Sequence, residues 1–192
     1  MVAAGTDEAG RGPLAGPVVA AAVILTNEQR KYLLSKGLKD SKKLSPSRRE
    51  TLFYQICECE VKWRAQAASP YKIDRINILQ ASLWCMKRSV ERLGSEPDIV
   101  LVDGCTYIPG LGIYQRCVVK GDDKVPAIAA ASVVAKVLRD RIMFTMDKVY
   151  PEYGFCAHKG YPSAQHRRIL MEIGPSPIHR VSFKGVSRET TL

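Results

Sequence analysis

The sequence predicts an α/β domain in which helices flank a mixed sheet. Segments typical of strands come first, marked by β-branched residues and, over residues 61–68, by period-2 alternation, and later strands alternate with segments of helical period. The chain has 192 residues, of which 46% are hydrophobic and 25% are charged, and this is typical of one domain with a single substantial core. No internal repeat or low-complexity tract points to another architecture.

The first third of the chain is expected to form three strands and two helices. In order, these are a strand hairpin over residues 2–25 with a glycine-rich turn at 10–13, a short helix over 27–36, a basic loop over 38–44, a helix over 45–60 and a strand over 61–68. β-Branched residues and alternating polarity mark the strands. Ser45 followed by Pro46 is typical of an N-cap and a first helical residue.

The rest of the chain alternates strands and helices. In order, we expect one long amphipathic helix over 73–93, strands over 98–103 and 113–119, an alanine-rich helix over 126–146, a glycine-rich loop over 154–160 and a short helix over 162–173. Apolar residues at helical spacing, with Gly94 as a C-terminal stop, predict that the 73–93 helix is continuous. The domain is expected to span residues 1–150, with a small C-terminal helical extension, residues 151–192, packed on it.

The charge balance favours a polyanionic partner. Twenty-nine Lys and Arg against 19 Asp and Glu give a formal net charge of +10, which predicts attraction to nucleic acid. Net charge also serves solubility, so the positions of the charges must decide. Basic residues concentrate in the last third of the chain, where we expect a phosphate-tracking surface together with some solvated helix faces. These residues are Arg139, Arg141, Lys148, Lys159, Arg167, Arg168, Arg180, Lys184 and Arg188.

Other features exclude several classes of protein. The six cysteines lack paired CxxC spacing and follow no secretory signal, so we expect reduced, mostly packing thiols. The longest apolar run, residues 17–25, is about half of what a membrane-spanning helix requires. We expect a soluble cytoplasmic protein without membrane association, and a monomer because no apolar stripe is self-complementary. The histidines lack metal-ligand spacing, and no catalytic role is assigned to them.

Carboxylates come directly after three of the predicted strands. They are Asp7-Glu8, Asp103 and Asp122-Asp123. Each alone could be a turn former or helix cap, a common role for Asp before Gly. In an α/β sheet, however, strand ends are where a site collects side chains from distant parts of the sequence. The conjunction of several such acids in a strongly basic chain favours a shared site.

A cluster of carboxylates is stabilised by a bound cation. Like charges raise some of the pKa values unless a cation lies among them, and hard oxygen ligands suit Mg²⁺ or Mn²⁺. Two such ions roughly 3.5–4 Å apart can activate a water and stabilise the leaving oxygen of a phosphodiester displacement. This chemistry would connect the acids with the basic surface.

Six motifs carry a resemblance to a known family. They are residues 6–17 (TDEAGRGPLAGP), 40–44 (DSKKL), 101–104 (LVDG), 119–122 (VKGD), 127–136 (AIAAASVVAK) and 158–162 (HKGYP). On these motifs the chain resembles the ribonuclease HII family, the type 2 ribonucleases H, from end to end. The resemblance implies a ribonuclease-H-like fold with a C-terminal helical extension, and hydrolysis of RNA within an RNA–DNA duplex.

The resemblance also implies site residues. The family's four-carboxylate site, catalytic and metal-binding, falls on Asp7, Glu8, Asp103 and Asp122. This chain has Asp-Asp where the family usually has a small residue after the first Asp. The position directly after Lys120-Gly121 favours Asp122, and Asp123 is then a solvated or helix-capping neighbour.

The implied substrate-binding residues lie in three motifs. They are Gly10, Arg11, Gly12, Lys42, Lys43 and Tyr161. The glycines would let backbone groups approach a ribose 2′-hydroxyl, the group that separates RNA from DNA, and Arg11 could reach a phosphate. By resemblance, Tyr161 stacks on the sugar of the deoxynucleotide after the ribonucleotide, and the two lysines lie near the nucleic-acid backbone. Each also has an ordinary interpretation, as a tight turn, a core tyrosine or solvated lysines.

The resulting hypothesis is a metal-dependent endonuclease. Its substrates would be RNA–DNA hybrids and duplex DNA with embedded ribonucleotides, cut 5′ to the ribonucleotide to leave 5′-phosphate and 3′-hydroxyl ends. One alternative is another nuclease or a transposase-like member of the same fold. The other is a non-catalytic nucleic-acid-binding domain whose acids serve metal-stabilised folding.

Overall fold

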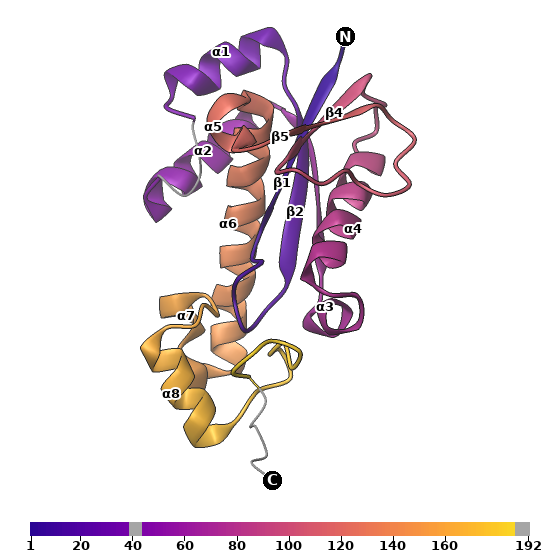
Figure 1. Cartoon of the computed structure of the whole chain (residues 1–192). Coiled ribbons are helices and arrows are strands. Elements are labelled where there is room, and N and C mark those ends of the chain that lie inside the picture. The colour runs from indigo at the N-terminus through magenta and orange to yellow at the C-terminus, as the bar shows by residue number, and fades with distance from the viewer. Residues whose placement is uncertain (39–43, 187–192) are drawn as a thin grey trace.

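The computed structural model describes residues 1–38 and 44–186, which form a five-stranded sheet flanked by helices (Figure 1). The sheet has the order β3-β2-β1-β4-β5. The antiparallel pairs are β1–β2 and β2–β3, and the parallel pairs are β1–β4 and β4–β5. The predicted mixed sheet is therefore confirmed. The strands are β1 (Ala3–Ala9), β2 (Val18–Ile24), β3 (Lys62–Ala68), β4 (Ile99–Asp103) and β5 (Gln115–Val118).

The helices cover both faces of this sheet. They are α1 (Asn27–Ser35), α2 (Pro46–Glu58), α3 (Pro70–Ile76), α4 (Ile78–Glu91), α5 (Gly121–Lys124), α6 (Pro126–Val149), the 3-10 turn η2 (Pro151–Tyr153), α7 (Phe155–His158) and α8 (Ala164–Ile173). Helices α2 and α6 lie on one face and α4 on the other (Figure 1). The predicted N-cap is confirmed, since the Ser45 side chain accepts a hydrogen bond from the Arg48 amide.

The interior strand β2, which lies between β3 and β1, shows how the two faces share the core. Ala21 and Val23 pack with the alanine-rich part of α6, whereas Ala20 and Ala22 pack with α4. Burial on both faces explains why β2 is apolar along almost its whole length rather than alternating with polar residues.

Helix α6 lies directly against β1. A Cβ at Gly5 would lie 2.4 Å from backbone atoms of Ala127 and Ile128. Only glycine at this position allows so close an approach of the helix to the strand. The first turns of α6 therefore lie beside the strand that carries Asp7 and Glu8.

One predicted element is wrong. The helix expected over residues 73–93 is two helices, α3 and α4, separated at Asn77. Asn77 has φ 63°, in the left-handed region, and its side chain caps α4 by accepting a hydrogen bond from the Gln80 amide. The apolar spacing continues across this single residue, so the hydrophobic pattern does not reveal the break.

The C-terminal segment packs on the loop that joins β1 to β2, residues 10–17. Leu14 and Ala15 share a hydrophobic cluster with Phe155 and Leu170. Backbone hydrogen bonds of 2.8 Å join Leu14 to Gly160 and to Arg180. The division of the chain at residue 150 stays a prediction, but this loop belongs structurally with the C-terminal segment.

Two bulk expectations can be compared with the structure. In residues 1–38 and 44–186, no helix is both long and apolar enough to cross a membrane. All six cysteines are free thiols, but only Cys85 is buried, and Cys57, Cys105 and Cys156 are exposed. The expectation that most cysteines pack in the core is therefore wrong.

Candidate active site

Asp7, Glu8 and Asp103 lie near one another at the end of the sheet where β4 ends. These parallel strands pair Thr6 with Val102, so the next residues, Asp7 and Asp103, lie side by side. The Gly121 amide donates a 2.7 Å hydrogen bond to Asp103 Oδ1, which holds the start of α5 and with it Asp122. We call Asp7, Glu8, Asp103 and Asp122 the acidic edge.

Asp7 is the most buried residue of the acidic edge, and one of its carboxylate oxygens has no hydrogen-bond partner among the described residues. Its side chain belongs to a residue only 3% exposed, and Oδ1 accepts a 2.7 Å hydrogen bond from the Glu8 amide. Oδ2 is buried without a hydrogen-bond partner among the described residues. Burial, and then the charges of Glu8 and Asp103, raise the pKa of Asp7 well above its ordinary value, against hydrogen bonding by Ser132 and the Glu8 amide.

Burial separates the two adjacent aspartates of α5. Asp122 is 5% exposed, whereas Asp123 is an exposed residue. A Cβ at Gly121 would lie 2.5 Å from Ile128 Cδ1 and 3.2 Å from Asp103 Oδ1, so glycine is needed for α5 to approach β4. These observations favour Asp122 as the acid that belongs to the acidic edge.

The acidic edge has the donor chemistry for a hard divalent cation. Its oxygens are the ligands that Mg²⁺ and Mn²⁺ prefer, and Asp7 Oδ2 lacks a partner that such an ion would supply. Among the described residues, however, no group of three or more His, Cys, Asp or Glu side chains has a geometry that could hold a metal ion. The residues fit a metal, but the carboxylates would have to draw together around it.

The predicted substrate-reading loop lies beside the acidic edge. Arg11 is largely exposed, and its Nη1 lies 3.4 Å from Glu8 Oε1. A Cβ at Gly12 would lie 3.8 Å from Tyr161 Cε1, so the tyrosine ring is next to this glycine although the two residues are 149 positions apart in sequence. Tyr161 is 41% exposed and therefore accessible. The loop therefore contacts Glu8 through Arg11 and lies beside Tyr161 at Gly12.

Three histidines hold the backbone that carries Tyr161. His179 Nδ1 accepts from the Ser176 amide at 2.9 Å, so the proton of the neutral ring is on Nε2, which donates to His166 Nε2 at 2.9 Å. His166 Nδ1 then donates to the Tyr161 carbonyl at 2.9 Å. His158 Nδ1 accepts from the Gly160 amide, and its Nε2 donates to the Tyr153 carbonyl. This chain of hydrogen bonds requires neutral histidines, and it positions the segment rather than binding a metal.

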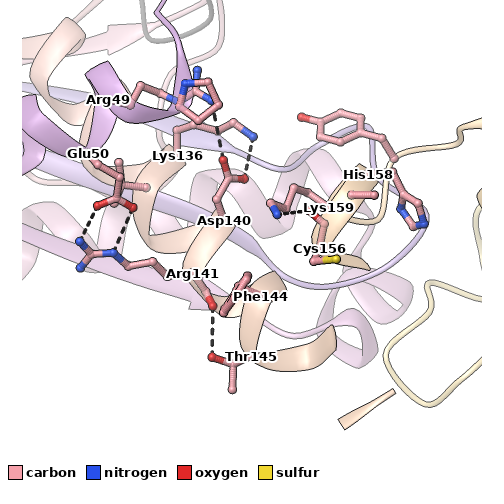
Figure 2. Close-up of a pocket in the computed structure, with 14 residues that line it drawn as sticks. Arg49, Glu50, Lys136, Asp140, Arg141, Phe144, Thr145, Cys156, His158 and Lys159 are labelled. Carbon is pink, nitrogen blue, oxygen red and sulfur yellow. Dashed lines mark hydrogen bonds and ion pairs between the residues drawn. The ribbon is translucent and has the colours of Figure 1, made fainter. Parts of the chain in front are cut away.

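A groove of about 740 Å³ extends from Tyr161 between α2, α6 and α7 (Figure 2). Arg49 and Lys136 both lie against Asp140, with N–O distances of 3.9 and 2.7 Å, and Arg141 pairs with Glu50 at 2.6 Å. Lys159 also lines the groove. The predicted Lys42 and Lys43 lie outside the described residues, although α2, which follows them in sequence, forms one wall.

Part of the expected phosphate-tracking surface is not at the surface. Arg139 and Arg180 are 0% exposed and donate to backbone carbonyl groups. The sequence analysis missed this structural role. A weak signal existed for Arg139, because it lies four residues from both Ala135 and Met143 on the apolar stripe of α6.

Solved ribonucleases H share this fold. The ribonuclease H2 of Pyrococcus horikoshii OT3 superposes with a TM-score of 0.83 and 29% identity over 97% of this chain and 95% of that chain. The RNase HII of Archaeoglobus fulgidus, solved in a complex with PCNA, gives 0.81 and 31% over 100% and 98%. The fold and its acidic edge thus define a hydrolase of the ribonuclease H class.

Sequence relatives narrow this class to one family. The family model for Ribonuclease HII matches residues 4–186. The Ribonuclease HII of Acaryochloris marina is 53% identical over 180 residues, 94% of this chain and 91% of that protein. The Ribonuclease HII of Geobacter sulfurreducens is 52% identical over 183 residues, 95% and 82% of the two chains. The chain belongs to the ribonuclease HII family, as its motifs predicted, and is a metal-dependent ribonuclease H that acts on RNA–DNA hybrids.

Proposed function

We propose that this enzyme cuts duplex DNA on the 5′ side of an embedded ribonucleotide, as well as the RNA strand of hybrids, and leaves 5′-phosphate and 3′-hydroxyl ends. The observation that carries the proposal is the contact between the two halves of the site. Arg11 of the glycine turn lies 3.4 Å from Glu8 of the acidic edge. A ribose read by the turn would therefore place its phosphate next to the carboxylates.

In this proposal Asp7, Glu8, Asp103 and Asp122 hold one or two Mg²⁺ or Mn²⁺ ions. When bound, such ions activate a water and stabilise the leaving oxygen of the phosphodiester. The chain's own contribution is to hold the carboxylates at the ends of rigid strands, with Asp7 buried and short of one partner. In this proposal the affinity for a cation arises because the fold holds the carboxylates in place.

The other proposed residues recognise the substrate. Backbone groups of Gly10 and Gly12 approach the ribose 2′-hydroxyl, Arg11 binds a phosphate and Tyr161 stacks on the following deoxyribose. Lys42 and Lys43 are proposed to contact the nucleic-acid backbone. All these residues come from one chain, so we propose that the monomer is the active form.

The test is a cleavage assay on three duplexes of one sequence: all DNA, DNA with one ribonucleotide, and an RNA–DNA hybrid. Each is incubated with Mg²⁺, Mn²⁺ or EDTA. We expect metal-dependent cutting of the second and third only, at the 5′ side of the ribonucleotide, with a 3′-hydroxyl that a polymerase can extend. Equal cutting of the all-DNA duplex, or a 3′-phosphate product, would contradict the proposal.

A matched pair of variants tests the acidic edge. Asp7→Asn should abolish cleavage while the variant still binds the duplex. Asp98→Asn, at the exposed start of β4 and at the opposite end of that strand from Asp103, should cleave normally. Cleavage by Asp7→Asn at the rate of the unmodified enzyme would remove Asp7 from the proposed site.

A further inference from the structure

Two buried arginines bind the loop that reads the ribose. Arg139 and Arg180 are the largest fully buried side chains. Within the described residues, their side chains donate six hydrogen bonds, all to backbone carbonyl oxygens, and Arg139 Nη1 is buried without a partner. Five of the six acceptors belong to the β1–β2 loop, and the sixth is Lys159. These acceptors are the carbonyl groups of Gly10, Arg11, Ala15, Gly16, Pro17 and Lys159.

Burial of the two guanidinium groups costs free energy unless the β1–β2 loop keeps the conformation that brings its carbonyl groups to them. Burial of a guanidinium is unfavourable without strong acceptors, and it lowers the pKa of Arg180 to about 9, with the nearby Arg139 charge adding to the effect. The carbonyl groups offset this cost only where the loop wraps closely around the side chains. Accordingly, a Cβ at Gly10 would lie 2.1 Å from Arg139 Nε.

The two arginines bind different parts of the proposed substrate-binding surface. Arg180 donates to the carbonyl groups of Gly10 at 2.6 Å and Arg11 at 3.0 Å, within the glycine turn itself. Arg139 donates to Lys159 at 3.0 Å, and its guanidinium carbon lies 5.7 Å from the centre of the Tyr161 ring. One arginine therefore holds the turn, and the other connects the loop with the tyrosine segment.

We propose that Arg139 and Arg180 are positioning residues that set the distance between the Gly10–Gly12 backbone and Tyr161, and that this distance determines how well the enzyme distinguishes ribose from deoxyribose. The inference rests on the proposed function, because it assigns a cause to the discrimination of that same site. Neither arginine touches the substrate. Both act through the backbone groups they hold.

Arg180→Lys is the sharpest test. Lysine keeps the charge but cannot present a planar fork of donors to three carbonyl groups. We expect the ratio of kcat/KM for the ribonucleotide-containing duplex to that for all-DNA duplex to fall by about tenfold or more, mainly through kcat, because small displacements of positioning groups are costly. Binding of all-DNA duplex should not change. Arg88→Lys, in α4 and paired with Glu91, is the matched control and should leave the ratio unchanged.

Hydrogen exchange gives a second readout that does not depend on activity. Backbone amides of residues 10–17 should exchange faster in Arg180→Lys than in the unmodified enzyme, while amides of α4 should not change. A folded Arg180→Lys that keeps the ratio and the slow exchange overturns the proposal. A variant that loses activity equally on all substrates, with the ratio intact, also overturns it.

Two further outcomes are separable. If Arg180→Lys does not fold, Arg180→Gln, which removes the buried charge but keeps an NH₂ donor, gives the same comparison with the same expected result. If the unmodified enzyme shows no preference for ribose, the proposed function fails. In that case the hydrogen-exchange result still decides whether the arginines hold the loop.

Discussion

Asp7 and Arg180 are buried charges on either side of the same loop, and they differ in how completely they are solvated by the protein. Arg180 is 0% exposed, and each of its three guanidinium nitrogens donates to a carbonyl oxygen. Asp7 is 3% exposed, but one of its two oxygens lacks a partner among the described residues, and burial, together with two neighbouring carboxylates, raises its pKa.

This difference in hydrogen bonding distinguishes a residue that supports the fold from a residue of a ligand site. A buried charge with a full set of hydrogen bonds is stabilised by the protein itself and adds rigidity. A buried charge that lacks a partner, beside charges of the same sign, is unfavourable until a ligand completes it. Arg180 thus supports the loop, whereas the acidic edge is proposed to hold a cation. Arg139 lies between these cases, because its Nη1 is buried without a partner among the described residues.

The largest expected effect separates the two adjacent aspartates of α5. Asp122→Asn should lower kcat about 10³-fold, or about 4 kcal/mol of transition-state stabilisation, because it removes a buried carboxylate of the acidic edge. Asp123→Asn makes the same chemical change at an exposed residue and should stay within about twofold. Single-turnover cleavage of a duplex with one ribonucleotide measures both. A larger loss in Asp123→Asn would mean that the wrong acid has been assigned.

The next effect concerns the loop side of the comparison. Gly10→Ala should cost roughly 3 to 4 kcal/mol of unfolding free energy, because φ is 98° and the new Cβ would lie 2.1 Å from Arg139 Nε. Gly104→Ala is the control, with φ 95° and nothing within 4 Å of the Cβ, and should cost only about 1 to 2 kcal/mol. Urea unfolding of both variants gives the values. Equal costs would show that the arginine contact does not constrain the loop.

The histidine chain predicts a pH dependence of similar size. Burial, and then the His166 charge, lowers the pKa of His179 from 6.5 to about 4, so the unfolded state binds more protons within that window. Stability is therefore complete above pH 6.5, falls as the pH decreases toward 4 and levels off below it. The loss from His179 is on the order of 3 kcal/mol.

Unfolding free energies measured across this pH window test the prediction. In His179→Gln the imidazole with the lowered pKa is gone, so the slope of stability against pH should be shallower than in the unmodified enzyme. The carboxylates titrate equally in both proteins and cancel in the difference. Identical slopes would show that His179 does not titrate with the predicted shift.

The smallest effect tests the cation at the acidic edge without any cleavage. Mn²⁺ at roughly ten times its Kd should stabilise the unmodified protein by about 1.4 kcal/mol. Asp7→Asn should be more stable than the unmodified protein by about 1 kcal/mol in EDTA, because a desolvated charge is removed, and should gain little from Mn²⁺. Thermal unfolding in EDTA and in Mn²⁺ measures this, with Asp98→Asn as control. Equal stabilisation of Asp7→Asn by Mn²⁺ would place the ion elsewhere.

Local patterns predicted most of the architecture. Period-2 alternation identified β3, apolar and β-branched runs identified β2 and β4, Ser45-Pro46 identified the start of α2, and the glycine-rich turn identified the hairpin loop. These features depend on neighbours a few residues away, so the sequence contains the required information. Asn77 is the exception, because a single left-handed residue interrupts the backbone without interrupting the hydrophobic spacing.

The sequence by itself indicated which acids could form a site, since each was predicted to follow a strand, and its motifs predicted the family. In the structure Asp7 and Glu8 lie within β1, Asp103 ends β4 and Asp122 lies in α5. Only the tertiary structure decided how those charges are solvated. Arg180 and Gly10 are 170 residues apart, and no local pattern shows that a surface-type residue will be buried against a loop so distant. Likewise, the unpartnered oxygen of Asp7 depends on β4 and α6 packing around β1. The physical reason is that burial and hydrogen-bond satisfaction are properties of contacts between remote segments, whereas strands and turns are chiefly properties of neighbours.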